Sequence, residues 1–204
     1  MIAIIDYGSG NVGAIANIYK QLRIPHKITG DVKELEEAER YILPGVGAFD
    51  ATMGYLNQSG MMALLNEQVL GRRKKVLGIC VGMQILAESS EEGVLPGLGW
   101  IPGRVRKIDI SSLSASPRLP HMGWNTVSPR PGASLFDGVE EAQGFYFLHS
   151  YHFETTDAAD VSATVDYGRK LVCAVEHRNV YGMQFHPEKS HANGVKVFRN
   201  FAGL

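Results

Sequence analysis

The sequence predicts an α/β fold: a doubly wound, mostly parallel open sheet with helices on both faces and added antiparallel hairpins. In the first 80 residues, short apolar runs alternate with helical patterns, which is the order expected of β-α-β units. Beyond about residue 100, short β-type runs are separated by Gly, Pro and Ser clusters, which is typical of hairpins. The length of 204 residues, without linker or internal repeat, favours a single domain over residues 1–204.

The first half of the chain is predicted to alternate strands and helices. Residues 1–5 form an apolar strand, and Val12, Ile15 and Tyr19 begin a pattern at three- and four-residue spacing that indicates a helix. The further predicted elements are strands at 26–29, 41–43 and 76–80, and helices at 34–40, at 49–70 with a break near residues 59–60, and at 83–88.

The second half is predicted to add hairpins to the same sheet. A turn at residues 177–179 joins the last two strands, and a helix at 195–201 closes the chain. The predicted strands are 105–110, 125–127, 145–148, 161–165, 171–175 and 180–185.

Composition and charge argue against several classes of partner and site. A formal net charge of -1 gives no electrostatic reason to expect nucleic acid or an anionic membrane. The apolar runs are too short to span a bilayer and no secretory signal is visible, so we expect a cytoplasmic protein. Two cysteines are too few for a disulfide framework, and the seven histidines show no metal-ligand spacing with cysteine. We therefore expect no metal and no cofactor.

A cysteine stands where an apolar strand is followed at once by a helical pattern. Gly78 and Gly82 flank Cys80 at minus two and plus two, which is the cysteine form of the G-x-S-x-G nucleophile elbow. Glycines are needed there because the turn is tight and bulky neighbours would crowd the adjacent strands. The alternative is a buried apolar cysteine, which is common for free thiols.

A candidate base follows another predicted strand near the end of the chain. His186 and Glu188 are separated by Pro187, which stiffens the exit from the strand. Glu188 can accept from one ring nitrogen of His186 while the other faces the thiol. Ligands of open α/β sheets bind beyond the carboxyl ends of strands, where both motifs lie. A surface histidine is the alternative, and His121 and His149 are weaker candidates for a binding role.

A different class of protein is suggested by the glycine-rich loop after the first strand. Gly8, Gly10 and Gly13 form a literal G-x-G-x-x-G, and Asp31 stands close to where a ribose-binding acid is wanted. These residues could mark a dinucleotide-binding protein, or the glycines could simply make a tight turn. The dinucleotide hypothesis explains neither the elbow nor the C-terminal histidine.

Several segments resemble one family over nearly the whole chain. Residues 78–84 and 186–188 are similar to the nucleophile and His-Pro-Glu segments of the class I (triad) glutamine amidotransferases. Within that family, residues 6–11, 44–49, 120–125 and 145–151 resemble the glutaminase subunits of imidazole glycerol phosphate synthase, in histidine biosynthesis.

The resemblance implies that glutamine is hydrolysed to glutamate and ammonia through a γ-glutamyl thioester on Cys80. His186 would act as general base and then as acid, with Glu188 as its orienting residue. The oxyanion hole would use the amide of Val81 and a second amide, from Val46 or Gly47. We hypothesise that this hole forms fully only when a partner signals. The resemblance assigns substrate binding to Gly45, Gln84, His149, Ser150 and Tyr151.

The implied partner is a (β/α)8-barrel cyclase that receives the ammonia internally. It would use the ammonia on a phosphoribulosyl aminoimidazole carboxamide ribotide to give imidazole glycerol phosphate. An ammonia donor needs a site sealed against water, so the resemblance implies a tight heterodimer. The residues that it places at this interface are Asn11, Trp124, Asn125, Tyr146 and Lys189.

Two further alternatives share the same catalytic residues. Segments 89–93, 96–100 and 186–191 look at least as much like paralogous subunits that supply ammonia to a sugar-modifying enzyme in surface-polysaccharide biosynthesis. A cysteine hydrolase or peptidase would also use Cys80 and His186, but in a more open cleft.

Overall fold

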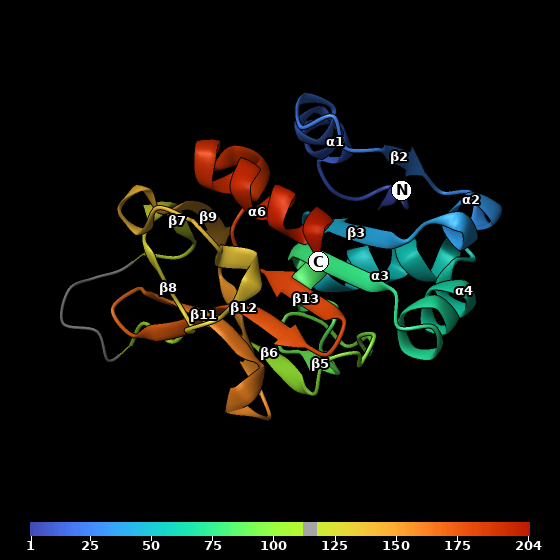
Figure 1. The fold of residues 1–204 in the computed structure, drawn as a ribbon. Helices are drawn as coiled ribbons and strands as arrows, with labels where there is room; N and C mark the ends of the chain where they lie inside the picture. Colours follow the sequence, from blue (N-terminus) through green and yellow to red (C-terminus); the bar gives the residue numbers. More distant parts are fainter. Residues whose placement is uncertain (112–117) are drawn as a thin grey trace.

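A computed structural model describes residues 1–111 and 118–204 of the chain, and it contains one large mixed sheet (Figure 1). The order along the sheet is β2-β1-β3-β4-β13-β12-β10-β6-β5, with β11 and β8 added beside β12, while β7 and β9 form a separate pair. The strands are β1 Ile2–Ile5, β2 His26–Thr29, β3 Arg40–Gly45, β4 Lys75–Cys80, β5 Ser89–Ser90, β6 Gly103–Lys107, β7 His121–Asn125, β8 Val127–Pro129, β9 Phe145–His149, β10 Tyr151–Thr155, β11 Val161–Asp166, β12 Lys170–His177 and β13 Val180–Met183.

The helices cover both faces of the parallel half. In Figure 1, α1 and α6 lie on one face, and α3 and α4 lie on the other. Asn11 caps α1 by accepting a hydrogen bond from the amide of Ala14. The buried face of this helix carries Ile15 and Tyr19. The helices are α1 Val12–Gln21, α2 Val32–Glu37, α3 Phe49–Gln58, α4 Met62–Asn66, α5 Val81–Gln84 and α6 His191–Gly203, with a π-helical turn at Glu67–Gly71 and 3-10 turns at Ser134–Phe136, Glu141–Gln143, Ala158–Asp160 and Pro187–Lys189.

The parallel strands confirm the predicted α/β class and bring the two motifs to one edge. β4 pairs in parallel with β3 on one side and with β13 on the other. Gly45 is the register partner of Cys80, and Met183 is the partner of Ile79. The loops that leave these three strands therefore meet at the carboxyl edge of the sheet.

Several predicted elements are wrong in their extent. The strands 105–110 and 180–185 end at Lys107 and Met183, and the helix 195–201 begins at His191. The predicted helix 83–88 is only the single turn Val81–Gln84, because the amide of Glu88 already bonds to the carbonyl of Gly103. The helix 34–40 ends at Glu37, since β3 already begins at Arg40. The predicted strand 125–127 spans the break between β7 and β8.

Two further findings correct the prediction of hairpins in one sheet. β7 pairs only with β9 among the described strands, so this hairpin stands apart from the large sheet. β10, which the sequence did not predict, pairs with β6 and β12. The predicted turn at 177–179 is a two-residue turn, because His177 already pairs with Val180.

None of the helices in residues 1–111 and 118–204 has the length and hydrophobicity that a membrane span requires.

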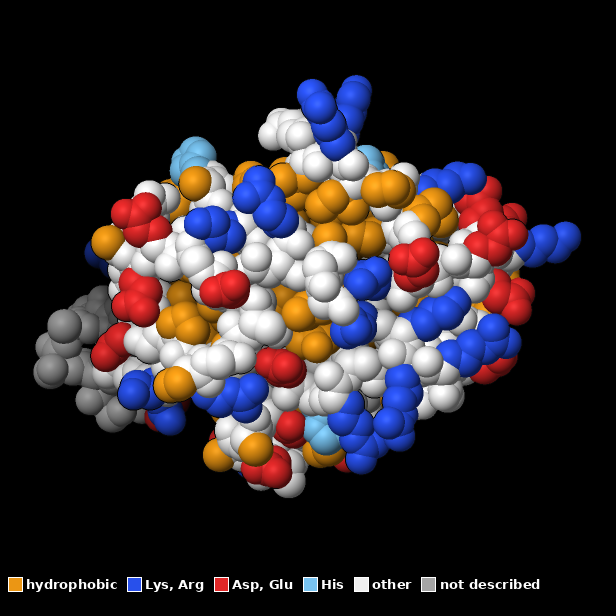
Figure 2. All heavy atoms as spheres, viewed as in Figure 1, with side chains coloured by type: hydrophobic (Ala, Val, Ile, Leu, Met, Phe, Trp, Pro, Cys, Tyr) orange, Lys and Arg blue, Asp and Glu red, His pale blue; other side chains and the backbone are white. Residues whose placement is uncertain are grey.

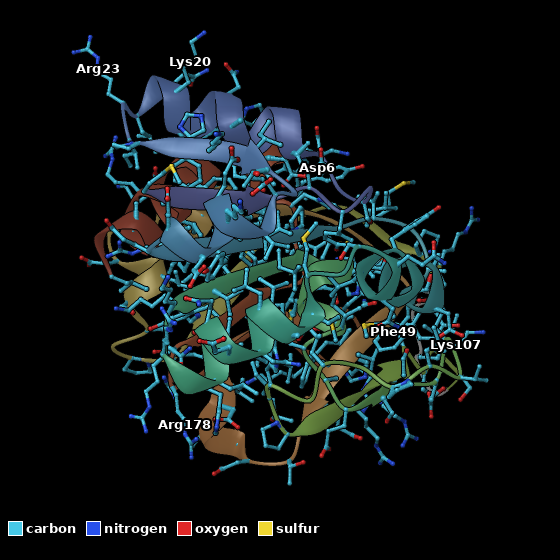
Figure 3. The ribbon with its side chains drawn as sticks, turned by 90° about the vertical axis from the view of Figure 1, so that its right-hand side faces the viewer. Asp6, Lys20, Arg23, Phe49, Lys107 and Arg178 are labelled. Atoms are coloured by element: carbon cyan, nitrogen blue, oxygen red, sulfur yellow. The ribbon has the colours of Figure 1, made fainter. Side chains whose placement is uncertain are left out.

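One group of basic side chains lies away from the elbow. Figure 2 shows a group of Lys and Arg side chains at the lower right of this face. Residues 72–75 precede or begin β4, and Arg178 lies in the turn that precedes β13, so all stand at the amino ends of these strands. In Figure 3, Asp6 and Phe49, which follow β1 and β3, lie on the side opposite Arg178. The basic residues among 72–75 and Arg178 are therefore remote from the carboxyl edge.

Candidate active site

Cys80 occupies a strained backbone position at the end of β4. Its φ of 56° and ψ of -113° lie outside the regions that a residue with a side chain ordinarily adopts. The residue is 5% exposed, and its neighbours in the elbow are packed against backbone. A Cβ on Gly82 would overlap the carbonyl of Leu43, and a Cβ on Gly78 would overlap the backbone of Gly82. The glycines of the motif are therefore required by close backbone approach, as the sequence predicted.

Replacing Gly82 by alanine is expected to destabilise the protein by about 3 kcal/mol, because the new methyl group meets backbone that side-chain rotation cannot move. Gly54 in α3 is the matched control, since nothing lies within 4 Å of a Cβ built there. Gly54→Ala is expected to stabilise by about 0.5 kcal/mol through helix propensity. Urea unfolding measures both, and equal effects of the two substitutions would contradict the packing argument.

The second cysteine is of a different kind. Cys173 in β12 is completely buried, and desolvation raises the pKa of its thiol. Cys173 thus has the environment of a buried, apolar cysteine, which was the alternative hypothesis for Cys80.

His186 and Glu188 are joined by a hydrogen bond after β13. His186 Nδ1 lies 2.9 Å from Glu188 Oε1, and the two side chains are 6% and 2% exposed. The backbone fixes this geometry, because the amide of His186 donates to the carbonyl of Tyr146 and Ser190 Oγ donates to the carbonyl of His186. The 3-10 turn Pro187–Lys189 brings the carboxylate back to its histidine. The pairing expected from the His-x-Glu spacing is thus present.

The electrostatics of the pair favour a charged imidazole. Burial alone lowers the pKa of His186, but the adjacent Cys80 and Glu188 side chains outweigh it and raise the value to about 10. Glu188 Oε2 has no hydrogen-bond partner in the described part of the chain, so the buried carboxylate is directed to His186 alone. An imidazolium beside a thiol is the arrangement that generates a thiolate nucleophile.

Cys80 and His186 open into a cavity of about 370 Å³. Four of the predicted substrate residues line this cavity: Gln84, His149, Ser150 and Tyr151. Val46, Gly47, Val81 and Lys189, which were predicted for other roles, line it as well. Three further lining residues were not predicted from the sequence: Glu92, Pro120 and Leu148. Gly45, which was also predicted to bind substrate, is not among the residues that line the cavity, and a Cβ on it would overlap the amide of Gly82. Glu92 also accepts a 2.8 Å bond from the amide of Phe49, the first residue of α3. Glu92 follows the short strand β5, so no periodic pattern in the sequence could have identified it as a site residue.

The candidate oxyanion loop, residues 44–47, is held by Ser9, to which the sequence analysis assigned no role. The amide of Val46 donates to Ser9 Oγ at 3.1 Å, and this hydroxyl donates back to the Val46 carbonyl at 3.2 Å. Gly47 has a φ of 93°, which only glycine adopts without strain. The Val46 amide is therefore directed to Ser9 in this conformation.

The glycine-rich loop that suggested a dinucleotide site packs against the oxyanion loop. A Cβ on Gly10 would overlap the side chain of Pro44, so this glycine allows a close approach of the two loops. Asp31 caps α2 by accepting from the amides of Lys33 and Glu34 at 2.8 and 3.2 Å. Gly10 and Asp31, two residues of the dinucleotide pattern, thus have structural uses.

The predicted interface residues lie on several elements. Asn11 is exposed at the start of α1, and Asn125 at the end of β7 donates to the carbonyl of Asp166. Lys189 Nζ lies 5.6 Å from the ring centroid of Tyr146, in cation–π geometry. Trp124 stacks on His191 at 5.1 Å and is 49% exposed.

Apolar side chains are also exposed beside the cavity. Val46 and Leu148 line it and are 47% and 39% exposed, and Met122, next to Leu148 in the β7–β9 register, is 65% exposed. Exposed apolar side chains that cluster around one site mark an interaction surface. No metal-binding cluster of His, Cys, Asp or Glu occurs within the described ranges.

An α/β sheet that presents a Cys-His-Glu arrangement at its carboxyl edge defines a cysteine-dependent hydrolase or transferase. The family model described as Glutamine amidotransferase class-I matches residues 3–203. The chain belongs to this family of class-I glutamine amidotransferases.

The similar curated proteins carry a more specific name. A protein of Bdellovibrio bacteriovorus named imidazole glycerol phosphate synthase subunit HisH is 53% identical, over 100% of both chains. A protein of the same name from Leptospira borgpetersenii is 48% identical, and one named HisH 2 from Pseudomonas aeruginosa is 45% identical, each again over 100% of both chains.

Solved structures support the fold. A structure described as glutamine amidotransferase has a TM-score of 0.72 at 19% identity and covers 100% of both chains. The structure of PurLQS from Thermotoga maritima has a TM-score of 0.68 at 20% identity, covering 99% of this chain and 97% of that one. At these identities the likeness concerns the fold alone.

Proposed function

We propose that this protein is the glutaminase subunit of imidazole glycerol phosphate synthase, which hydrolyses L-glutamine and passes the ammonia to a cyclase subunit. The observation that carries the proposal is the buried Cys80, His186 and Glu188 arrangement at the cavity, in a chain about half identical to relatives of that name. The exposed apolar side chains beside the cavity support a partner that covers it.

The proposed reaction proceeds in two steps. The Cys80 thiolate attacks the amide carbon of glutamine, and His186 gives its proton to the departing nitrogen, so that ammonia leaves and a thioester remains. Water then attacks the thioester while His186 removes its proton, and glutamate departs as the Cys80 sulfur is released. Glu188 holds the imidazole in place and stabilises its positive charge through both steps.

The oxyanion that forms in each step needs two N–H donors. The Val81 amide follows the nucleophile at the start of α5 and supplies one. The second comes from Val46 or Gly47, after the peptide turns away from Ser9. We propose that a signal from the partner releases this peptide, so that hydrolysis is coupled to the use of ammonia.

Replacing Ser9 by alanine is expected to raise the rate at which the isolated protein hydrolyses glutamine by about fivefold, because two hydrogen bonds that hold the Val46 peptide are lost. Ammonia release measures the effect, with and without the cyclase. Ser59→Ala is the matched control, since Ser59 also bonds to a backbone carbonyl, at the end of α3. An unchanged rate, or an isolated wild-type protein that is as fast as the complex, contradicts the coupling.

The proposed partner is a (β/α)8-barrel cyclase that makes imidazole glycerol phosphate in L-histidine biosynthesis. The proposed contacts are Asn11, Trp124, Asn125, Tyr146 and Lys189. Lys189 lines the cavity, and Trp124, Asn125 and Tyr146 lie on the β7–β9 pair, whose residues Leu148 and His149 line it.

The pathway is tested by reconstitution with the cyclase subunit of the same organism. We expect the pair to form imidazole glycerol phosphate from glutamine and the aminoimidazole ribotide substrate. In the control, a complex with Cys80→Ser uses ammonium salts but no glutamine. Glutamine hydrolysis without product, despite a cyclase that is active with ammonium, would instead favour supply of ammonia to another acceptor, such as a sugar-modifying enzyme.

A further inference from the structure

Beneath the nucleophile lies a glutamine that the triad does not use. Gln184 is completely buried, and its side-chain amide stands between two residues of the site. Nε2 donates to Cys80 Sγ at 3.7 Å, and Oε1 accepts from Gln84 Nε2 at 3.0 Å.

The contacts continue from Gln84 to a pair of buried histidines. Gln84 Nε2 also donates to the carbonyl of Tyr151 at 3.3 Å, and His149 Nδ1 lies 2.8 Å from the same carbonyl. His149 Nε2 lies 2.9 Å from His121 Nδ1. Asn125 Nδ2 lies 3.4 Å from the remaining ring nitrogen of His121. The polar atoms thus form one chain from the end of β7 to the sulfur.

Chemistry permits only one direction of donation along this chain. The carbonyl of Tyr151 can only accept, so His149 carries its proton on Nδ1 and accepts at Nε2. His121 must then donate from Nδ1. Desolvation lowers the pKa of His121 to about 4 and that of His149 to about 3, so both rings are neutral at neutral pH.

The same reasoning fixes both glutamines. Gln84 must present its NH₂ group to the Tyr151 carbonyl, and its second hydrogen requires an acceptor at Gln184. Gln184 therefore offers its oxygen to Gln84 and its nitrogen to Cys80. A buried amide held in this way can donate to the sulfur but cannot accept from it.

We propose that Gln184 positions the Cys80 sulfur and stabilises its thiolate, and that the buried His121–His149 pair holds in place the Tyr151 carbonyl, which orients Gln184 through Gln84. The inference deepens the proposed glutaminase function and rests on it only for the effect on turnover. A hydrogen bond to a charged sulfur is stronger than one to a neutral thiol, so the donor favours the reactive form. An amide that merely fills the core would leave the reactivity of the sulfur unchanged.

The first test is Gln184→Met, which keeps the volume and removes the donor. We expect iodoacetamide to alkylate Cys80 about tenfold more slowly at pH 7, with the midpoint of the rate–pH profile moved upward. Gln68→Met is the matched control: Gln68 is also completely buried, its side-chain atoms have no hydrogen-bond partner in the described residues, and it lies before the amino end of β4. A Gln184→Met rate equal to that of the wild type and of the control overturns the proposal.

The second test addresses the histidines without touching the sulfur or the glutamine bridge. His121 stacks between Phe147 and Tyr167, at 4.6 and 4.0 Å between ring centroids, so His121→Phe preserves the stacking and removes the Nδ1 donor together with the Nε2 contact to Asn125. We expect about threefold slower alkylation, restored by His121→Asn, whose amide nitrogen replaces Nδ1. In the double variant with Gln184→Met, no further loss is expected. Additive losses, or none from His121→Phe, overturn the assigned chain.

Alkylation also separates this inference from the proposed function. A wild-type protein that fails to hydrolyse glutamine in the reconstituted complex contradicts the glutaminase proposal alone. The alkylation series still decides whether Gln184 and His121 control the sulfur.

Discussion

Replacing Cys80 by serine is expected to abolish glutamine hydrolysis, with kcat lowered by about 10,000-fold or more. Serine keeps the shape of the elbow, but its hydroxyl does not ionise beside an imidazole as a thiol does. Ammonia release by the complex with the cyclase measures the loss. Product formation from ammonium salts, which bypasses Cys80, serves as the control that the variant folds and binds its partner.

A glutamine-analogue electrophile gives an independent measure of the same residue. It is expected to label the wild-type protein, to be competed by glutamine, and to leave Cys80→Ser unlabelled. Full glutaminase activity in the reconstituted Cys80→Ser complex would falsify the catalytic assignment. Labelling that glutamine does not compete would favour a cysteine hydrolase of another specificity.

Replacing Glu188 by glutamine is expected to lower kcat by about 1,000-fold with a smaller change in KM. The neutral amide no longer stabilises the imidazolium, and it can present a donor to Nδ1 and so select the wrong tautomer. The activity of the complex with glutamine measures the effect. Glu34→Gln is the control, because Glu34 is a partly exposed carboxylate that bonds to Lys27 and Thr29 of β2, three strands away from β4 in the sheet. Similar losses in both variants contradict the role assigned to Glu188.

The same substitution is expected to change the dependence of stability on pH. The pKa of His186 is raised from 6.5 to about 10 in the folded protein, so its contribution to stability is complete below pH 6.5 and disappears as the pH rises toward 10. In Glu188→Gln the carboxylate no longer raises the pKa, and the decline is shallower. Urea unfolding at pH 6, 8 and 10 compares the two slopes. Parallel slopes contradict the coupling of the two side chains.

Much of the parallel half of the fold could be predicted from sequence because short apolar runs alternate there with helical patterns. The strand predicted at 26–29 matches β2 residue for residue, and the break near Gly60 falls between α3 and α4. The second half of the fold was harder to predict from the sequence. Thr126 separates β7 from β8, which pair with different strands, and no local pattern encodes that change of partner.

The site shows the same division between local and distant information. The spacing around Cys80 and from His186 to Glu188 is local, so the sequence predicts the geometry of each motif. Ser9 and Gln184 could not be predicted in the same way. Ser9 lies 37 residues from Val46, and Gln184 lies 104 residues from Cys80. Within a predicted strand, Gln184 carries no mark that distinguishes an amide directed at sulfur from one directed at solvent.

The complete burial of Cys173 has a practical consequence for measuring this enzyme. Because the chain holds two cysteines, brief alkylation of the folded protein is expected to label one sulfur, and alkylation in denaturant to label both. A ratio of one label per chain under native conditions therefore indicates a fully folded preparation, and any excess over one measures the misfolded fraction. Turnover numbers of variants can then be normalised to titrated active centres, which separates a slow enzyme from a preparation that is partly misfolded.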